Sequence, residues 1–237
     1  MIDVDKLLLD AKATKAEFAQ LIKDIPYERK GILFSEMFFM FLCAEQYRTN
    51  NILESGRARG QSTLVLANIF PDKNIISIEH DPNSVDVDIA YNRLKGCKNV
   101  RLMFGNSIEL LPQIANKNDV VLIDGPKGYR SLRLAFKLLN SGKFPLVFIH
   151  DTTKGTSERN FLCNHVRNAV FSDDLEIASI TSSLDHGRVE LRDEFKLDGE
   201  KGYGMSLACL PFDKHINYKY ILFKAAIRGS IYRWFKR

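Results

Sequence analysis

The stretch LESGRARGQS combines residue types that could hold a small ligand. Gly56 can adopt the backbone conformations of a tight turn, and Gly60 allows close backbone approach at the start of a following helix. The stretch lacks the GK[ST] ending of a P-loop, and Ala58 stands where the dinucleotide motif GxGxxG has its second glycine. Glu54 would repel a pyrophosphate. We therefore expect a cofactor with a cationic centre and an ammonium group, held by this loop and Ser62.

A second acid, Glu79, lies near the end of the apolar run NIISIEH, roughly 20 residues after the glycine loop. An acid at this spacing can accept hydrogen bonds from the hydroxyls of a bound ribose. Taken singly, Glu54 or Glu79 would most simply be a solvated charge at the end of a strand. The glycine loop and the two acids together favour a nucleoside cofactor.

The stretch DVVLIDGPKGYR places Asp124 directly after four apolar residues and Lys127 on the turn that follows. Asp151 comes in the same way after the run FPLVFIH. The carboxyl ends of parallel strands are where ligands bind in open α/β sheets, so these groups are expected near the cofactor loop. By itself, Lys127 would be a lysine on a solvated turn. His80 and His150 also end apolar runs, and a hydrogen-bonded strand-end histidine is the expectation for both.

All of these residues stand at the ends of short apolar runs that alternate with helical patterns. This alternation is typical of βαβ units, in which a parallel sheet carries helices on both faces. We expect an α/β fold with a single doubly wound, mostly parallel, seven-stranded Rossmann-like sheet and an antiparallel last strand. The predicted strands cover residues 51–55, 74–80, 100–104, 119–124, 144–151, 175–181 and 204–210.

Helical spacing predicts helices over 3–24 and 35–48, the second with Ser35 as N-cap. Further helices are predicted between the strands, among them one near 129–140 and one within 157–171. The chain is thus divided into an N-terminal helical extension (1–50), a cofactor-binding domain (51–213) and a basic amphipathic C-terminal helix (214–237).

The charge of the chain is uneven along its 237 residues. The net charge is +5, yet seven Lys and Arg and no acid follow residue 213, which leaves 27 basic against 29 acidic residues in the range 1–213. A nearly neutral body argues against a nucleic-acid-binding protein. The four cysteines are scattered, no apolar run is long enough to span a membrane, and no secretory leader pattern is present, so we expect a cytoplasmic protein.

The motifs ExGxxxGxS, IEHDP, GNSIELLP and LIDGPK together resemble the class I S-adenosylmethionine-dependent methyltransferases, and most closely their catechol-type O-methyltransferase branch. The likeness covers about residues 31–152 and extends loosely to the final strand. It implies S-adenosylmethionine as the cofactor. The residues that would contact it are Glu54, Gly56, Gly60, Ser62, Glu79, Asn106 and Ser107.

The same resemblance implies that Asp124 and Asp151 orient the acceptor or a divalent metal, and that Lys127 removes the acceptor proton. A lysine whose pKa is lowered by partial burial can serve as a base. Oxygen ligands suit Mg²⁺. Thr152 stands where the family has an asparagine, so a third metal ligand here would be weaker. Reactions with and without Mg²⁺ both remain open.

The implied activity is O-methylation of a hydroxyl on a small molecule or a saccharide, because DGPKGY also resembles a turn of polysaccharide-directed methyltransferases. Two alternatives stay open. One is a methyltransferase acting on RNA or protein, and the other is a non-catalytic domain that binds the cofactor or serves as a scaffold. The segment 183–202, which begins near Asp185, His186 and Arg188, is long enough to form a lid.

The C-terminal segment places apolar residues on one stripe of a helix, with Lys224 among them. In one reading this helix packs on its own domain or on a neighbouring subunit, as in a homodimer. In the second it makes peripheral contact with the inner face of a membrane, and a nucleic-acid role is the remaining alternative. The stripe consists of Tyr220, Phe223, Ile227, Ile231 and Trp234.

Overall fold

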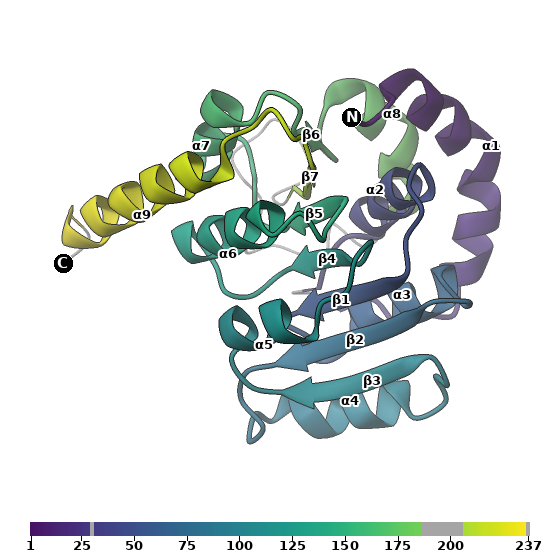
Figure 1. Ribbon diagram of the computed structural model, residues 1–237. Coiled ribbons are helices and arrows are strands. Elements are labelled where there is room, and N and C mark those ends of the chain that lie inside the picture. Colours follow the sequence, from purple (N-terminus) through teal and green to yellow (C-terminus); the bar gives the residue numbers. More distant parts are fainter. Residues whose placement is uncertain (29–30, 186–205, 236–237) are drawn as a thin grey trace.

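Seven strands form one sheet in the order β3-β2-β1-β4-β5-β7-β6 (Figure 1). Strands β1 to β5 are parallel, and β7 runs antiparallel to both β5 and β6. The predicted mostly parallel sheet with an antiparallel last strand is therefore confirmed. The computed structural model describes residues 1–28, 31–185 and 206–235. The strands are β1 (Asn51–Ser55), β2 (Asn74–Glu79), β3 (Val100–Phe104), β4 (Val120–Ile123), β5 (Leu146–Ile149), β6 (Val170–Phe171) and β7 (Ala208–Pro211).

Helices alternate with the parallel strands, as the βαβ pattern requires. They are α1 (Val4–Ile22), α2 (Phe34–Glu45), α3 (Gln61–Ile69), α4 (Asp86–Leu94), α5 (Ser107–Ile114), α6 (Tyr129–Asn140), α7 (Ser157–His165), α8 (Leu175–Thr181) and α9 (Tyr218–Phe235). The helix expected near 129–140 matches α6. None of the helices in the described residues has both the length and the apolar character needed to cross a membrane.

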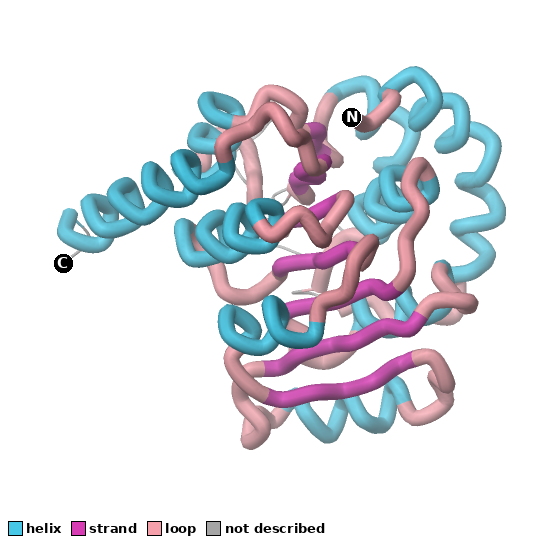
Figure 2. Tube along the Cα trace, viewed as in Figure 1, coloured by secondary structure: helices cyan, strands magenta, loops and turns pink. Residues whose placement is uncertain are grey.

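The sheet is covered on both faces (Figure 2). Helices α1, α2, α3 and α8 pack on one face, and α5, α6, α7 and α9 belong to the cluster on the other face. Successive residues of β4 face opposite sides of the sheet. Val120 and Leu122 belong to the apolar cluster under α1, α2, α3 and α8, and Val121 and Ile123 belong to the cluster on the other face. A central strand buried on both faces needs a continuous apolar run, which explains the four apolar residues before Asp124.

The strand expected over 175–181 is wrong, because this segment forms helix α8. Ile177 and Thr181 are buried one helical turn apart, whereas Leu175 is exposed. One buried stripe of this kind suits a helix rather than a strand. The sixth strand is instead the short β6, and the helix predicted within 157–171 ends at His165.

The predicted N-cap Ser35 is also wrong, since it lies inside α2 and the N-cap is Leu33. The Asp185 carboxylate accepts hydrogen bonds from the backbone N–H groups of Phe34 (2.8 Å) and Ser35 (3.0 Å). A distant acid therefore caps this helix. Asp185 ends the short 3₁₀ helix η1 (Ser182–Asp185), and the expected lid over 183–202 falls mostly outside the described residues.

Candidate active site

The carboxyl ends of four parallel strands bring the predicted residues to one edge of the sheet. The register pairs Ser55 of β1 with Ile78 of β2 and with Ile123 of β4, and it pairs Ile123 with Ile149 of β5. The residues that directly follow these four paired positions are Gly56, Glu79, Asp124 and His150.

The glycine loop touches the turn after β4. Gly56 has a φ of +93°, and a Cβ placed there would lie 2.7 Å from the backbone nitrogen of Gly125. The Ser55 hydroxyl donates a hydrogen bond to the Gly125 carbonyl. Only glycine fits this approach, because any side chain would force the two loops apart.

Glu79 holds the glycine loop and also borders a cavity. Its carboxylate accepts hydrogen bonds from the backbone N–H groups of Ala58 (2.8 Å) and His80 (2.7 Å). The cavity has a volume of about 280 Å³. Its lining includes Gly56, Glu79, Asn106, Ser107 and Lys127.

A second cavity of about 520 Å³ is lined by Arg57, Gln61, Ser62 and Asp124, among others. Both polar atoms of the buried Gln61 side chain, and Nε and Nη2 of the buried Arg57, have no hydrogen-bond partner among the described residues. Buried polar groups without partners are costly. These atoms have almost no accessible surface, so they lie behind the cavity wall; the Arg57 guanidinium lies over the Phe104 ring and donates from Nη1 to the Ser77 carbonyl at 3.0 Å.

Glu54 and Gly60, both predicted to contact the cofactor, make contacts within the protein. Glu54 is fully buried and accepts hydrogen bonds from the hydroxyls of Ser62 (2.5 Å), Thr63 (2.5 Å) and Ser77 (2.6 Å). Burial raises the pKa of the Glu54 carboxyl, and these hydroxyls oppose the shift. A Cβ at Gly60 would lie 2.9 Å from Leu94, so this glycine serves the packing of α3 on α4.

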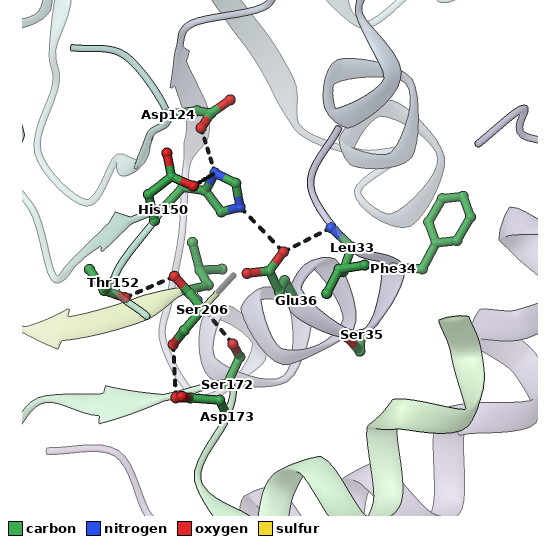
Figure 3. A network of polar contacts seen from close by, with 12 residues as sticks. Leu33, Phe34, Ser35, Glu36, Asp124, His150, Thr152, Ser172, Asp173 and Ser206 are labelled. Atoms are coloured by element: carbon green, nitrogen blue, oxygen red, sulfur yellow. Dashed lines mark hydrogen bonds and ion pairs between the residues drawn. The ribbon is translucent and has the colours of Figure 1, made fainter. Parts of the chain in front are cut away.

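An acid and amine cluster lies beside the first cavity. The Lys127 ammonium forms ion pairs with the carboxylates of Asp124 and Asp151, the second at 2.6 Å. His150 Nδ1 lies 2.6 Å from Asp124 Oδ1, and His150 Nε2 lies 3.3 Å from Glu36 Oε2 (Figure 3). The predicted trio of Asp124, Lys127 and Asp151 is thus brought together, and two buried residues extend it.

Opposite charges in this cluster stabilise the charged form of each partner. Burial alone would lower the pKa of His150, but Glu36 and Asp124 raise it to about 10. Burial alone would likewise lower the pKa of Lys127, but Asp124 and Asp151 raise it. The expectation of a lowered lysine pKa is therefore wrong. Burial would raise the pKa of Asp124, whereas His150 and Lys127 hold it below its usual range.

Thr152 does not face this cluster. Its fully buried hydroxyl donates to the Ser206 carbonyl at 2.8 Å (Figure 3), so the predicted contribution of Thr152 to a metal site is not supported. Ligand atoms of Asp124, His150 and Asp151 all lie within 4.8 Å of one another. Asp151 has a φ of +61°, in the left-handed region that few non-glycine residues adopt, and such residues cluster at functional sites.

Glu36 was not among the predicted site residues. It is 1% exposed, although it stands in the strongly apolar stretch SEMFFMFL of α2. A single acid in such a stretch needs a partner when it is buried. That isolated charge was the available signal, but only the tertiary structure shows that the partner is His150.

Comparisons with known proteins point to methyltransferases. A family model described as "Putative methyltransferase" matches residues 48–123. The catechol O-methyltransferase of Niastella koreensis is 30% identical over 95 residues, which are 38% of this chain and 43% of that protein. The chain thus matches less than half the length of this relative. The tRNA (guanine-N(7)-)-methyltransferase of Bacteroides thetaiotaomicron is 25% identical over 219 residues, 89% of this chain and 79% of that protein.

Solved structures of similar fold include two methyltransferases. The O-methyltransferase TomG from Streptomyces achromogenes, in complex with SAM, shares 19% identity at a TM-score of 0.47, covering 90% of this chain and 92% of TomG. The SAH-bound methyltransferase PaMTH1 from Podospora anserina shares 14% identity at a TM-score of 0.47, covering 87% and 88%.

The matched segment 48–123 contains the glycine loop, Glu79 and Asn106, and it ends directly before Asp124. The match therefore spans the residues predicted to hold the cofactor and stops before the acid and amine cluster. The family match over residues 48–123 and the catechol-type relative bear out the resemblance to S-adenosylmethionine-dependent methyltransferases, and the strand order is that of the expected Rossmann-like sheet.

Proposed function

We propose that the protein transfers the methyl group of S-adenosylmethionine to a hydroxyl group of a small molecule or a saccharide. The observation that carries this proposal is the position of Lys127. Its ammonium lies between the carboxylates of Asp124 and Asp151, next to the cavity bordered by Glu79. Carboxylates and an ammonium group, which can exchange protons with an acceptor, thus lie next to the candidate cofactor site at one edge of the sheet.

The two cavities suit the two halves of this cofactor. Glu79 offers carboxylate oxygens to ribose hydroxyls, and Asn106 and Ser107 would border the adenine. The second cavity, whose lining includes Ala58, Gln61 and Ser62, would take the methionine part. When bound, S-adenosylmethionine supplies a sulfonium carbon that is open to in-line displacement.

Methyl transfer forms one oxygen–carbon bond and breaks one sulfur–carbon bond, and the acceptor hydroxyl gives up its proton. The protein must therefore position the oxygen and accept that proton. Because Lys127 is held charged, we assign the proton to a carboxylate, with Asp151 as the more accessible candidate. The Lys127 ammonium would stabilise the negative charge that develops on the oxygen.

The residues present fit a bound Mg²⁺ poorly. The Thr152 hydroxyl is turned to Ser206, the third neighbour of the two carboxylates is the imidazole of His150, and Lys127 lies between Asp124 and Asp151. Mg²⁺ prefers oxygen ligands in octahedral geometry. We therefore propose a reaction without this metal, and expect turnover to be the same after treatment with EDTA as with added Mg²⁺. Activity that EDTA abolishes and Mg²⁺ restores would contradict this part of the proposal.

A second candidate acceptor is RNA. The similarity to a tRNA methyltransferase extends over 89% of the chain, further than the similarity to the catechol enzyme. The nearly neutral composition of residues 1–213 disfavours it, since nucleic-acid binding depends on clustered positive charge.

Calorimetry followed by methyl transfer tests these proposals in order. We expect heat of binding with S-adenosylmethionine and with S-adenosylhomocysteine, and none with NAD⁺. Radiolabelled methyl transfer is then measured with catechols, a panel of saccharides and total tRNA. Label in a hydroxyl acceptor supports O-methylation, and label in tRNA alone would replace it with the second candidate. A failure to bind either cofactor form would refute the cofactor assignment itself.

A further inference from the structure

Helix α9 carries two apolar faces. One of them, formed by Tyr218, Ile221, Ala225 and Gly229, is buried. The fit against α6 is close, because a Cβ at Gly229 would lie 2.8 Å from the Cβ of Tyr129. The predicted packing of this helix on its own domain is therefore confirmed for one face.

The opposite face of α9 is exposed and also apolar. We call it the α9 stripe, and it consists of Tyr220, Phe223, Ile227, Ile231 and Trp234. Phe223 is 62% exposed and Trp234 is 77% exposed. Spacings of three and four residues place all five side chains on one side of a helix, opposite the buried face. A continuous exposed apolar surface of this kind marks an interaction site.

Positive charge flanks the α9 stripe on both sides. Helical geometry places Lys219 along one edge and Lys224 and Arg228 along the other. The Lys224 ammonium lies 4.6 Å from the centre of the Tyr220 ring, so it stays at the border of the stripe. No acidic residue occurs in the sequence after Asp213.

We propose that the α9 stripe docks the protein onto an anionic lipid surface. Aliphatic and aromatic side chains would enter the boundary between headgroups and acyl chains, and the flanking Lys and Arg would meet lipid phosphates and carboxylates. Trp and Tyr at the two ends of the stripe suit this interface, because their rings are apolar with a polar edge. The proposal is independent of the reaction that the protein catalyses.

A second copy of the chain is a less suitable partner. In a symmetric dimer the same surface faces itself, so the Lys219, Lys224 and Arg228 side chains of both copies would be gathered at one interface without an acid on this helix to pair with them. Like charges placed together across an interface oppose association. Anionic lipid headgroups provide the complementary charge that a second copy lacks.

The direction of α9 agrees with such docking. Its C-terminal part projects from the body at the end of the molecule to which the parallel strands point (Figure 1). The stripe continues along this part of the helix through Ile231 and Trp234, which are 47% and 77% exposed.

Vesicle sedimentation of the full chain tests the proposal. Wild-type protein should sediment with vesicles of phosphatidylcholine containing about 30% phosphatidylserine, bind pure phosphatidylcholine more weakly, and be largely released by about 1 M salt. The double variant Phe223→Ser/Ile227→Ser and the triple variant Lys219→Glu/Lys224→Glu/Arg228→Glu should each bind at least about tenfold more weakly.

Matched controls separate the stripe from general surface effects. Leu9 and Leu175 are 68% and 71% exposed on other helices, so Leu9→Ser/Leu175→Ser removes similar apolar surface elsewhere. Lys12→Glu/Lys95→Glu/Lys98→Glu makes the same change of charge at exposed sites away from α9. Both controls should bind as the wild type does, and circular dichroism should show that all variants are folded.

Three results would overturn the proposal. The first is a wild-type protein that fails to bind anionic vesicles at low salt. The second is equal loss of binding in the stripe variants and their matched controls. The third is an absence of vesicle binding together with another interaction that the stripe variants abolish. A dimer seen by analytical ultracentrifugation and lost in these variants would assign the stripe to a second copy of the chain, and RNA binding lost in them would assign it to RNA.

Discussion

Glu36 Oε2 lies 3.3 Å from His150 Nε2, and both side chains are almost completely buried. The same Glu36 oxygen accepts the Leu33 N–H at 2.8 Å, so the start of α2 is tied to the strand end that carries Asp151. His150 in turn holds Asp124 through its other nitrogen. A helix before the sheet thus fixes the orientation of the candidate catalytic carboxylates.

Removing the Glu36 carboxylate should destabilise the protein. Glu36→Ala leaves a buried charged histidine without one partner, and breaking a buried ion pair typically costs about 3 kcal/mol. Glu36→Gln keeps a hydrogen-bond acceptor and should lose less. The free energy of unfolding in urea is the measurement, and Glu17→Ala at an exposed position of α1 is the control. Equal stability of Glu36→Ala and Glu17→Ala would show that the contact contributes nothing.

His150 should make the stability depend on pH. The pKa of its side chain is raised to about 10 in the folded protein, so the folded state holds a proton that the unfolded state releases near pH 6.5. This contribution is fully present below about pH 6.5 and is lost as the pH rises to about 10. The free energy of unfolding should fall across this window by an amount on the order of a few kcal/mol.

The variant His150→Gln checks this assignment. It should unfold with a flatter pH dependence between these limits, while His215→Gln, at an exposed position, should keep the wild-type slope. A wild-type protein whose stability is constant between pH 6.5 and 10 would contradict a charged His150 in the folded state.

Lys127 should be needed for turnover and not for cofactor binding. Lys127→Ala removes the cation from between Asp124 and Asp151, and loss of a group of this kind typically costs about 100-fold or more in rate. Affinity for S-adenosylhomocysteine by calorimetry should change little. Lys98→Ala, at an exposed position, is the control, and full activity of Lys127→Ala would remove the residue from the mechanism.

A further variant distinguishes the two roles of Lys127. Arginine remains charged and cannot serve as a base at ordinary pH. Measurable activity in Lys127→Arg, well above that of Lys127→Ala, is expected if the charge itself stabilises the developing oxyanion. Activity no higher than that of Lys127→Ala would favour the lysine as the proton acceptor.

Gly56 should be indispensable for cofactor binding. Gly56→Ala places a Cβ 2.7 Å from the Gly125 nitrogen and also strains a φ of +93°, so the two loops that border the cavity must separate. We expect affinity for S-adenosylmethionine to fall by about tenfold or more. Gly96→Ala is the matched control, since a Cβ at Gly96 meets nothing within 4 Å. Unchanged affinity of Gly56→Ala would mean that the cofactor lies elsewhere.

Local patterns were sufficient for most of the sheet. Runs of apolar residues ending in glycine or acid marked β1 to β5, because a strand buried on both faces must be apolar throughout its length. They failed at 175–181, where the apolar residues suited either a strand or a short helix, and only the burial of Ile177 and Thr181 on one side distinguishes the two.

The sequence by itself determined the α/β class, the edge of the sheet at which the predicted site residues meet, and the grouping of Asp124, Lys127 and Asp151. These features follow from the type of each residue and its position at the end of a strand, and both can be read from the sequence. Tertiary structure alone decided that Glu36 pairs with His150, that Thr152 turns to Ser206, that Glu54 is internal, and that one apolar face of α9 stays exposed. Each of these depends on which distant segment packs against a side chain, and packing between distant segments leaves no periodic trace in the sequence.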